Sequence, residues 1–427
     1  MKSFVKSLLS DNLKDLLKRI VKVYITRISF FSFINRISLE KHIKNKNLDI
    51  LVVPEIKDKK FLEDIHWRLI YYLYPIRNTI NSITYISNTS HHPINKPQNL
   101  SNELLNFTGL NQKFKTTNLN LIKKSKYQLI LNHNKNFNFF NSKYKNKKNY
   151  MIDYINNKEA SEWLINISLD TTNKKTLEYI TNKSWEQYKY LYSKIKKQKV
   201  LVCGSGPSFE ELSVDFQHYD VMICNSIVKN IDFIKKSKPK YLAFGDPVFH
   251  TGPSLYSERF RKDVKQLINF CNPYIFTLLR DFPIYNELFS KKELEKFIFI
   301  PTKKIEKFNL ELEKKFYIKG TGNILTLFML PIAMNLYTEI NLTGFDGKTK
   351  SDNKYYWKHS SLNQYYDLLE NVKQVHPGFF DKDDKFYDIY YENHINTVKQ
   401  WLDIATIKKI KINNLTRSNI FDFQIKN

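Results

Sequence analysis

The second half of the chain alternates between short runs of consecutive apolar residues and longer segments whose apolar residues recur with a helical period. Apolar runs without polar alternation are typical of strands buried on both faces of a parallel sheet. We therefore expect a Rossmann-like α/β domain over residues 198–427, with helices on both faces of the sheet. The predicted strands are residues 199–204, 220–225, 240–246, 274–279, 297–301, 338–344 and 409–414, and the predicted helices include 323–336 and 388–404.

The first half shows a weaker form of the same alternation. Strands are predicted at 49–56, 82–87 and 127–132, with a helix at 62–74. This order of elements indicates a smaller α/β domain over residues 46–150.

Polar segments separate these predicted elements. Residues 88–125 are rich in Asn, Ser, Pro and Lys and are expected to form loops. The Asn- and Lys-rich stretch 137–150 is expected to mark a domain boundary. Residues 151–197 are predicted to be a mainly helical connector.

Residues 1–45 are predicted to form an amphipathic, basic helical region. Apolar side chains follow a helical stripe over residues 4–24, and most of the Lys and Arg side chains lie off that stripe. Two interpretations fit this pattern. The helix binds the anionic inner face of a membrane, or its apolar face packs on the protein's own core.

Charge and cysteine content narrow the class of protein. The formal net charge is +26, which favours an anionic partner. The lysines are spread along the chain, and neither zinc-finger spacing nor an RNP-like string is present, so nucleic acid is not the expected partner. The three cysteines, Cys203, Cys224 and Cys271, fit neither a disulfide framework nor a zinc site. Without a signal-peptide pattern or a long apolar run, we expect a cytoplasmic protein that is peripheral to the plasma membrane if the N-terminal helix binds it.

A glycine-rich turn follows the first predicted strand of the second half. Glycines at the carboxyl end of a strand let a ligand approach the backbone closely, and Ser208 is placed to cap a following helix whose amides attract phosphate. A tight turn without a ligand would look the same. The predicted nucleotide-binding residues here are Gly204, Ser205, Gly206, Pro207 and Ser208.

Polar residues also end the next predicted strands. Asn225 and Ser226 follow the second strand and Asp246 follows the third, and these side chains fit either contacts to a nucleotide or helix caps. A second glycine turn, with Thr321 and Gly322, opens an apolar helix and offers a further anion site. Asp346 ends the strand after that helix.

These motifs resemble the bacterial sialyltransferases of glycosyltransferase family 42. The resemblance covers roughly residues 198–415 and rests on GSGPS after the first strand, Cys-Asn and Phe-Gly-Asp-Pro after the next two, Gly-Thr-Gly before the apolar helix, and Leu-Thr-Gly-Phe-Asp after it. It implies a variant of the glycosyltransferase A-like fold, CMP-sialic acid as donor and no metal ion. The family usually has Asn where Ser205 and Asp246 stand, and its Arg before the second glycine turn has only Lys319 as a counterpart.

The resemblance also implies a histidine base and tyrosine hydroxyls near the phosphate. His394 and His376 are the candidate bases, because an imidazole has a pKa suited to accepting the proton of an acceptor hydroxyl. Each of them also fits an ordinary surface or capping histidine. The predicted contacts to donor or acceptor sugar are Asp346, Tyr356, His359 and Tyr390.

The sequence therefore predicts an inverting glycosyltransferase without a metal or other cofactor, acting in lipopolysaccharide or capsule biosynthesis. It would move sialic acid or a related keto-acid sugar such as Kdo from a CMP-activated donor to a glycan or lipid-linked acceptor. Two alternatives stay open. One is a flagellin glycosyltransferase or pterin pyrophosphokinase-like enzyme, and the other is a non-catalytic nucleotide-binding protein at the membrane.

Overall fold

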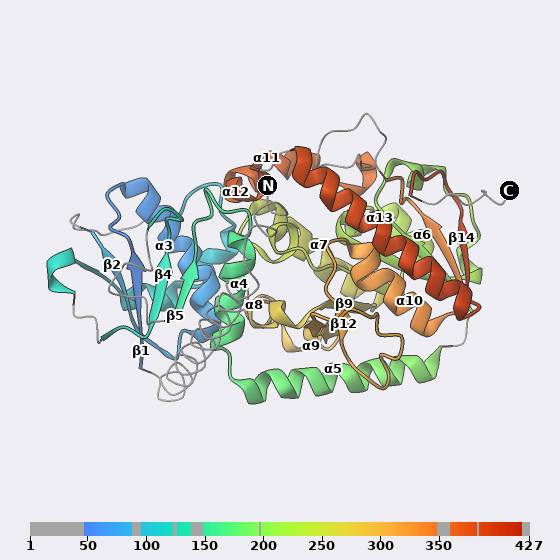
Figure 1. The fold of residues 1–427 in the computed structure, drawn as a ribbon, viewed down its shortest axis with the longest axis horizontal. Coiled ribbons are helices and arrows are strands. Elements are labelled where there is room, and N and C mark those ends of the chain that lie inside the picture. Colours follow the sequence, from blue (N-terminus) through green and yellow to red (C-terminus); the bar gives the residue numbers. More distant parts are fainter. Residues whose placement is uncertain are drawn as a thin grey trace, which may run out of the picture. The chain divides into compact units, whose positions relative to one another are not determined.

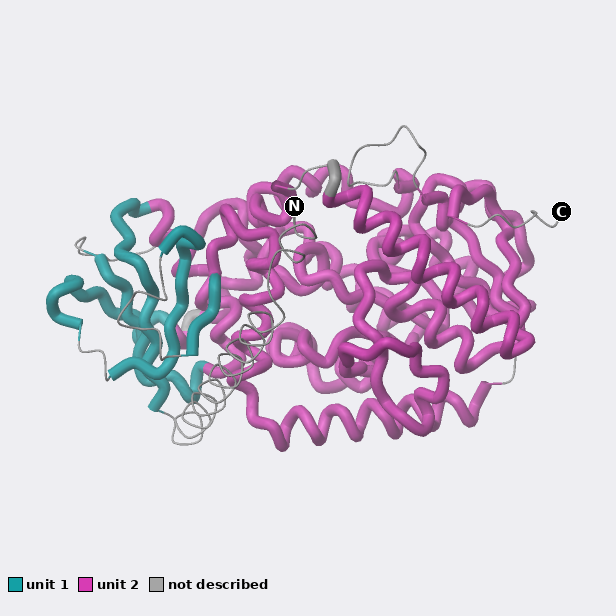
Figure 2. The backbone as a smooth tube through the Cα atoms, viewed as in Figure 1, with its two compact units in different colours: residues 1–59, 77–92, 111–151 teal, residues 60–76, 93–110, 152–427 magenta. Residues whose placement is uncertain are grey.

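The computed structural model describes residues 47–87, 95–122, 126–137, 148–195, 198–347, 359–381 and 384–420. The predicted N-terminal helix over 1–45 lies outside these residues. The chain divides into two compact units (Figure 2). Unit 1 consists of residues 1–59, 77–92 and 111–151, and unit 2 consists of residues 60–76, 93–110 and 152–427.

Unit 1 contains a parallel sheet with the strand order β3-β2-β1-β4-β5. All six residues of β1 are buried, as expected for the central strand of a sheet covered on both faces. Two of the strands were not predicted, because one lies in the expected loop region and the other at the expected boundary. The strands are β1 (Leu48–Val53), β2 (Ile80–Ile86), β3 (Phe114–Thr117), β4 (Leu129–Asn132) and β5 (Lys148–Met151).

Unit 2 contains a larger sheet with the order β10-β9-β8-β7-β6-β13-β14, in which every described pair of neighbours is parallel. This confirms the predicted α/β class and each of the seven predicted strands. Its strands are β6 (Lys199–Cys203), β7 (Asp220–Cys224), β8 (Tyr241–Ala243), β9 (Tyr274–Leu278), β10 (Phe297–Ile300), β13 (Glu339–Thr343) and β14 (Lys411–Asn414), beside a small pair, β11 (Thr302–Lys303) and β12 (Ile318–Lys319).

Helices cover both faces of this sheet. Successive side chains of a strand point to opposite faces, and nearly all residues of β6, β7, β9 and β10 are buried. Across the described residues of both units, the helices are α3 (Lys59–Leu73), α4 (Ala160–Thr171), α5 (Lys174–Lys194), α6 (Ile231–Ser237), α7 (Leu255–Cys271), α8 (Phe282–Leu288), α9 (Lys291–Leu294), α10 (Leu330–Leu336), α11 (Leu369–Val375), α12 (Pro377–Phe380) and α13 (Asp384–Ile407) (Figure 1).

The predicted apolar helix over 323–336 is irregular in the structure. Residues Leu325–Met329 form a π-helical turn that runs into α10. Pro331 has no N–H to donate to the carbonyl group of Leu327, which removes one α-helical hydrogen bond at this point. Such turns are frequent at functional sites, and this one directly follows the second glycine turn.

The strand order places a crevice at the carboxyl end of β6. From β6 the chain builds outward through β7, β8, β9 and β10, and then returns to the opposite side of β6 with β13. Ligands of open parallel sheets bind at such a reversal of strand order. The ends of β6 and β13 remain joined there, because Gly206 donates its backbone N–H to the oxygen of Gly344 at 2.9 Å.

Candidate active site

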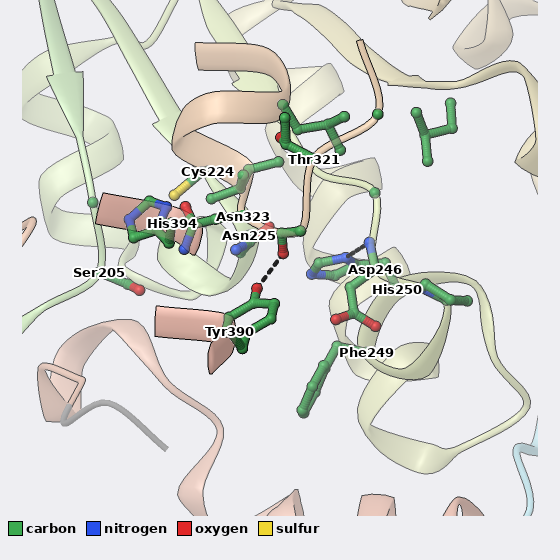
Figure 3. A pocket seen from close by; sticks show the side chains of 18 of the residues that line it. Ser205, Cys224, Asn225, Asp246, Phe249, His250, Thr321, Asn323, Tyr390 and His394 are labelled. Atoms are coloured by element: carbon green, nitrogen blue, oxygen red, sulfur yellow. Dashed lines mark hydrogen bonds between the residues drawn. The ribbon is translucent and has the colours of Figure 1, made fainter. Parts of the chain in front are cut away.

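A cavity of about 720 Å³ lies at the carboxyl ends of the strands of unit 2. Figure 3 shows side chains from β7, from the segment after β8, from the second glycine turn and from α13 facing it. The cavity brings together most of the residues that the sequence analysis selected. These are Gly204, Ser205, Gly206, Asn225, Ser226, Asp246, Thr321, Gly322, Asp346, His359, Tyr390 and His394.

The remaining selected residues are not part of the described lining. Pro207, Ser208 and His376 do not line the cavity. Tyr356 lies outside the described residues.

The first glycine turn differs from its predicted role as a phosphate site. Ser208 does not cap a helix. Its backbone N–H and its hydroxyl both donate to the carboxylate of Asp346, at 3.0 Å and 2.9 Å. The helix that follows is a short 3₁₀ segment, Pro207–Glu211, capped by Gly206 without a side-chain hydrogen bond. A carboxylate of the protein thus occupies the place predicted for a phosphate, and Asp346 joins the ends of β6 and β13.

Glycine is required where these two strand ends meet. Gly344 has φ +71, in the left-handed region that glycine tolerates best. A Cβ atom on Gly204 would overlap the carbonyl oxygen of Gly344. Glycine at these positions therefore lets the backbones of the two strand ends approach each other closely.

Asn225 ends β7 in an unusual conformation. Its φ is +47, which is uncommon for a residue other than glycine. Its side-chain oxygen Oδ1 is buried and accepts no hydrogen bond from the described residues. A buried acceptor in a strained residue that lines a cavity is suited to a ligand donor such as an amino or hydroxyl group.

Asp246 combines a structural role with its position in the cavity. Its Oδ1 accepts the backbone N–H of Val248 at 2.8 Å, so it caps the helical turn Pro247–Thr251. The backbone N–H of Asp246 donates to Nδ1 of His250 at 3.0 Å (Figure 3). His250 also lines the cavity, and burial, together with the positive charge of Arg261, lowers its pKa to about 3.

The second glycine turn is held in place by α13. Tyr390 donates its hydroxyl to the carbonyl oxygen of Gly322 (Figure 3), and a Cβ atom on Gly322 would overlap the Tyr390 ring. The side-chain oxygen of Asn323 accepts the backbone N–H of Leu325, the first residue of the π-helical turn, at 2.9 Å. Thr321 accepts the hydroxyl of Thr326 at 3.0 Å, which leaves the hydroxyl hydrogen of Thr321 able to donate into the cavity.

Two of the candidate histidines line the cavity. His394 lies one helical turn after Tyr390 on α13, and burial lowers its pKa to about 4. His359 lines the cavity beside the first glycine turn, where its Nδ1 is 2.8 Å from the hydroxyl oxygen of Ser205. Burial lowers the pKa of His359 to about 4. Both side chains are therefore neutral at neutral pH.

His376 is buried away from the cavity. Its Nδ1 lies 2.8 Å from the hydroxyl oxygen of Ser161 on α4, and only 2% of the residue is exposed. Burial lowers its pKa well below the usual value. The His376 side chain therefore does not reach the cavity, where a base would have to act on the acceptor hydroxyl.

The charged or titratable residues of the cavity that the sequence analysis missed include His250, Arg280 and Glu162. Arg280 directly follows the strand predicted at 274–279 and lies two residues after β9, so it carried the same signal of a polar residue after a buried strand that selected Asn225. Glu162 comes from α4, and no local pattern relates a helix of the predicted connector to this edge of the sheet.

No group of three or more His, Cys, Asp or Glu side chains within the described residues is placed to hold a metal ion. No helix in the same part of the chain has the length and apolar character needed to cross a membrane.

No protein-family model and no curated protein matches the chain. Solved structures similar to part of it include the sialyltransferase CST-II in complex with trisaccharide acceptor and CMP, at 17% identity and a TM-score of 0.27, covering 51% of this chain and 81% of that one. Another is the sialyltransferase CstII from Campylobacter jejuni in complex with a substrate analogue, cytidine-5′-monophosphate, at 16% identity and a TM-score of 0.29, covering 54% and 90%. Similarity this low does not assign an activity to this chain.

Proposed function

We propose that this chain is a glycosyltransferase that transfers sialic acid or a related keto-acid sugar from a CMP-activated donor. The observation that carries the proposal is the cavity itself, in which three consecutive strand ends, the second glycine turn and a histidine of α13 converge. Its volume of about 720 Å³ suits a ligand of nucleotide-sugar size. The choice of CMP rests on the motifs that resemble family 42.

The nucleoside is proposed to lie against the ends of β6 and β7. Gly204 and Gly206 line the cavity at this point, and the buried oxygen of Asn225 accepts a hydrogen bond from the nucleoside. The phosphate then lies toward Thr321, whose hydroxyl can donate to it. Tyr390 fixes the carbonyl group of Gly322 and thereby the position of this turn.

The proposed reaction is a single inverting displacement without a metal ion. The acceptor hydroxyl oxygen forms a bond to the anomeric carbon, and the bond from that carbon to the phosphate oxygen breaks. The electron pair of the broken bond leaves with CMP. A neutral ring nitrogen of His394 accepts the proton of the acceptor hydroxyl.

The acceptor is proposed to enter over the rim formed by β11 and β12. Lys303 and Lys319 are paired in register on these strands, and Lys304 follows β11. Positive charge on the rim favours an acidic or lipid-linked acceptor at an anionic surface, such as a precursor of lipopolysaccharide or capsule.

Release of CMP from CMP-sialic acid and CMP-Kdo, with and without EDTA, tests this function. We expect release that EDTA does not change. His394→Gln should lower kcat by about 10²- to 10⁴-fold while CMP still binds, because loss of a general base affects the chemical step. His376→Gln is the matched control, since His376 is also buried but lies outside the cavity, and its kcat should stay near that of the wild type.

Three outcomes would contradict the proposal. Binding of nucleotide without any release of CMP would identify a non-catalytic nucleotide-binding protein. A strict requirement for magnesium would favour the pyrophosphokinase-like alternative. Unchanged kcat in His394→Gln would remove His394 from the mechanism.

A further inference from the structure

Arg280 brings a positive charge into the cavity and is poorly satisfied by the protein. It follows β9, at the edge of the sheet where β6, β7 and β8 end. Its Nε is buried and donates no hydrogen bond to the described residues. Its Nη2 reaches only the carbonyl oxygen of Gly245, at a long 3.5 Å. A guanidinium has five N–H donors in a planar fork, so Arg280 retains most of its capacity for an anionic ligand.

Two carboxylates lie beside Arg280, and neither forms a close bidentate pair with it. Oε1 of Glu162 is 3.3 Å from Nη1, and Oδ1 of Asp281 is 3.7 Å from Nε. Asp281 is fully buried, and burial raises its pKa to about 7, so it carries only part of a negative charge at neutral pH. The Asp281 side chain therefore neutralises Arg280 incompletely.

Glu162 differs from Asp281 because it can leave. Its side chain is 53% exposed, whereas that of Arg280 is 22% exposed. An ion pair at this exposure contributes little, typically less than about 1 kcal/mol. Glu162 can turn into solvent, where its own charge is hydrated, and an arriving carboxylate can then take its place on the guanidinium of Arg280.

We propose that Arg280 binds the carboxylate of an acidic donor sugar, and that Glu162 occupies this position as an internal competitor until the donor arrives. This inference rests on the proposed function, because it assumes that the nucleotide of the donor lies at β6 and β7. It adds the residue that selects an acidic sugar over a neutral one.

The order of the strands agrees with this assignment. β8 separates β7 from β9, and neighbouring strands lie about 4.8 Å apart, so Arg280 is about 10 Å along the sheet edge from Asn225. Figure 3 shows Asp246, at the end of β8, on the opposite side of Asn225 from Ser205. A donor with its nucleoside at Asn225 can therefore extend across Asp246 toward Arg280.

Binding of three ligands to four proteins tests the inference. The ligands are CMP, CMP-sialic acid and the carboxyl methyl ester of CMP-sialic acid, and isothermal titration gives each Kd. The proteins are the wild type, Arg280→Gln, Glu162→Gln and the control Lys292→Gln, which removes an exposed charge of α9 that does not line the cavity.

Opposite effects of the two variants are expected. Arg280→Gln should weaken binding of CMP-sialic acid by about 10- to 100-fold, the effect of losing a charge-assisted pair, and should change the Kd of CMP and of the ester by less than about twofold. Glu162→Gln should lower the Kd of CMP-sialic acid and leave the Kd of CMP unchanged. Lys292→Gln should change the Kd of each of the three ligands by less than about twofold, because its charge lies outside the cavity.

Each contrary result has a distinct meaning. If CMP binds but Arg280→Gln weakens CMP and CMP-sialic acid equally, Arg280 serves the phosphate and the inference is overturned. If Glu162→Gln weakens binding of CMP-sialic acid, Glu162 is a ligand partner and not a competitor. If the wild type binds neither CMP nor CMP-sialic acid, the proposed function fails and the inference falls with it.

Discussion

At the scale of one residue, the left-handed backbone of Asn225 places its side-chain oxygen at the cavity. A left-handed conformation costs a residue with a side chain about 1–2 kcal/mol, although Asn tolerates it better than most. Asn272 has the same conformation, with φ +52, but there it ends α7 as a helix cap. Asn225 has no such role and instead places a buried oxygen at the cavity.

The substitution Asn225→Gly keeps the left-handed backbone conformation and removes the side chain, so it separates the effect of the conformation on stability from the effect of the side chain on binding. Relief of strain and the greater freedom of the unfolded chain oppose each other, so the free energy of unfolding should change by less than about 1 kcal/mol. The Kd of CMP should rise about tenfold, the effect of one lost hydrogen bond. Denaturant unfolding and titration calorimetry give both values.

Asn272→Gly is the control for this prediction. It replaces an Asn that has the same left-handed conformation but lies at a helix cap, and it should leave the Kd of CMP unchanged. Equal binding of CMP by the wild type and Asn225→Gly would show that the Asn225 side chain does not contact the nucleotide.

At this scale the sequence predicted where polar residues gather but not their partners. Asn225 and Asp246 were found because the carboxyl ends of parallel strands share one edge. The bond between Ser208 and Asp346 was not foreseen, because it joins residues far apart in the chain. His376, which spacing also selected, does not line the cavity, because spacing along the sequence does not tell on which side of the fold a histidine is buried.

At the scale of elements, the second glycine turn and α13 form one assembly. The Tyr390 ring covers Gly322, and His394 follows one helical turn later on the same side of α13. Any change that moves the Tyr390 ring away from Gly322 should therefore move the proposed base relative to the proposed phosphate position.

Gly322→Ala tests this coupling, with Gly320→Ala as its matched control. A Cβ atom on Gly322 would meet the Tyr390 ring at 2.6 Å, whereas one on Gly320 would have nothing within 4 Å. Overpacking of this kind costs about 1–3 kcal/mol. We expect Gly322→Ala to weaken CMP binding and to lower the rate of CMP release at least about tenfold, and Gly320→Ala to change neither. Equal behaviour of the two variants would contradict the coupling.

The elements that were predicted are those with a continuous apolar pattern. The seven strands of the large sheet are short apolar runs that are buried on both faces, and this is why they were recognised. β3 (FKTT) and β5 (KNYM) were missed because half or more of their residues are polar and only partly buried or exposed. The π-helical turn was missed because its apolar sequence is equally compatible with an α-helix.

At the scale of the whole molecule, unit 2 buries several neutral histidines. Burial lowers the pKa of His250 to about 3 and the pKa values of His359 and His394 to about 4, and it lowers that of His376 well below the usual value. In the unfolded chain each imidazole returns to a pKa of about 6.5. Below that pH the unfolded state binds protons that the folded state does not.

Stability should therefore decrease as the pH falls from about 6.5 toward 4, and should not depend on these groups above about 6.5. Each buried histidine contributes a slope of at most about 1.4 kcal/mol per pH unit, so the four together contribute at most about 5.6 kcal/mol per pH unit. Urea unfolding at a series of pH values measures this slope. His394→Gln should reduce it by about a quarter, whereas His218→Gln, at an exposed histidine, should not. A slope that is the same in all three proteins would contradict the assignment of His394 as a buried neutral group.

The central claim is that the sheet edge of unit 2 binds a cytidine monophosphate without a metal ion. The most direct test is the thermal stability of the purified protein with CMP, CDP, UDP, ADP and ATP, each with magnesium and with EDTA. A ligand that binds only the folded state adds about 2.7 kcal/mol at a hundred times its Kd, which is a measurable shift. The account predicts a shift with CMP that is the same in EDTA. A shift confined to ATP or to UDP, or one that needs magnesium, would contradict it.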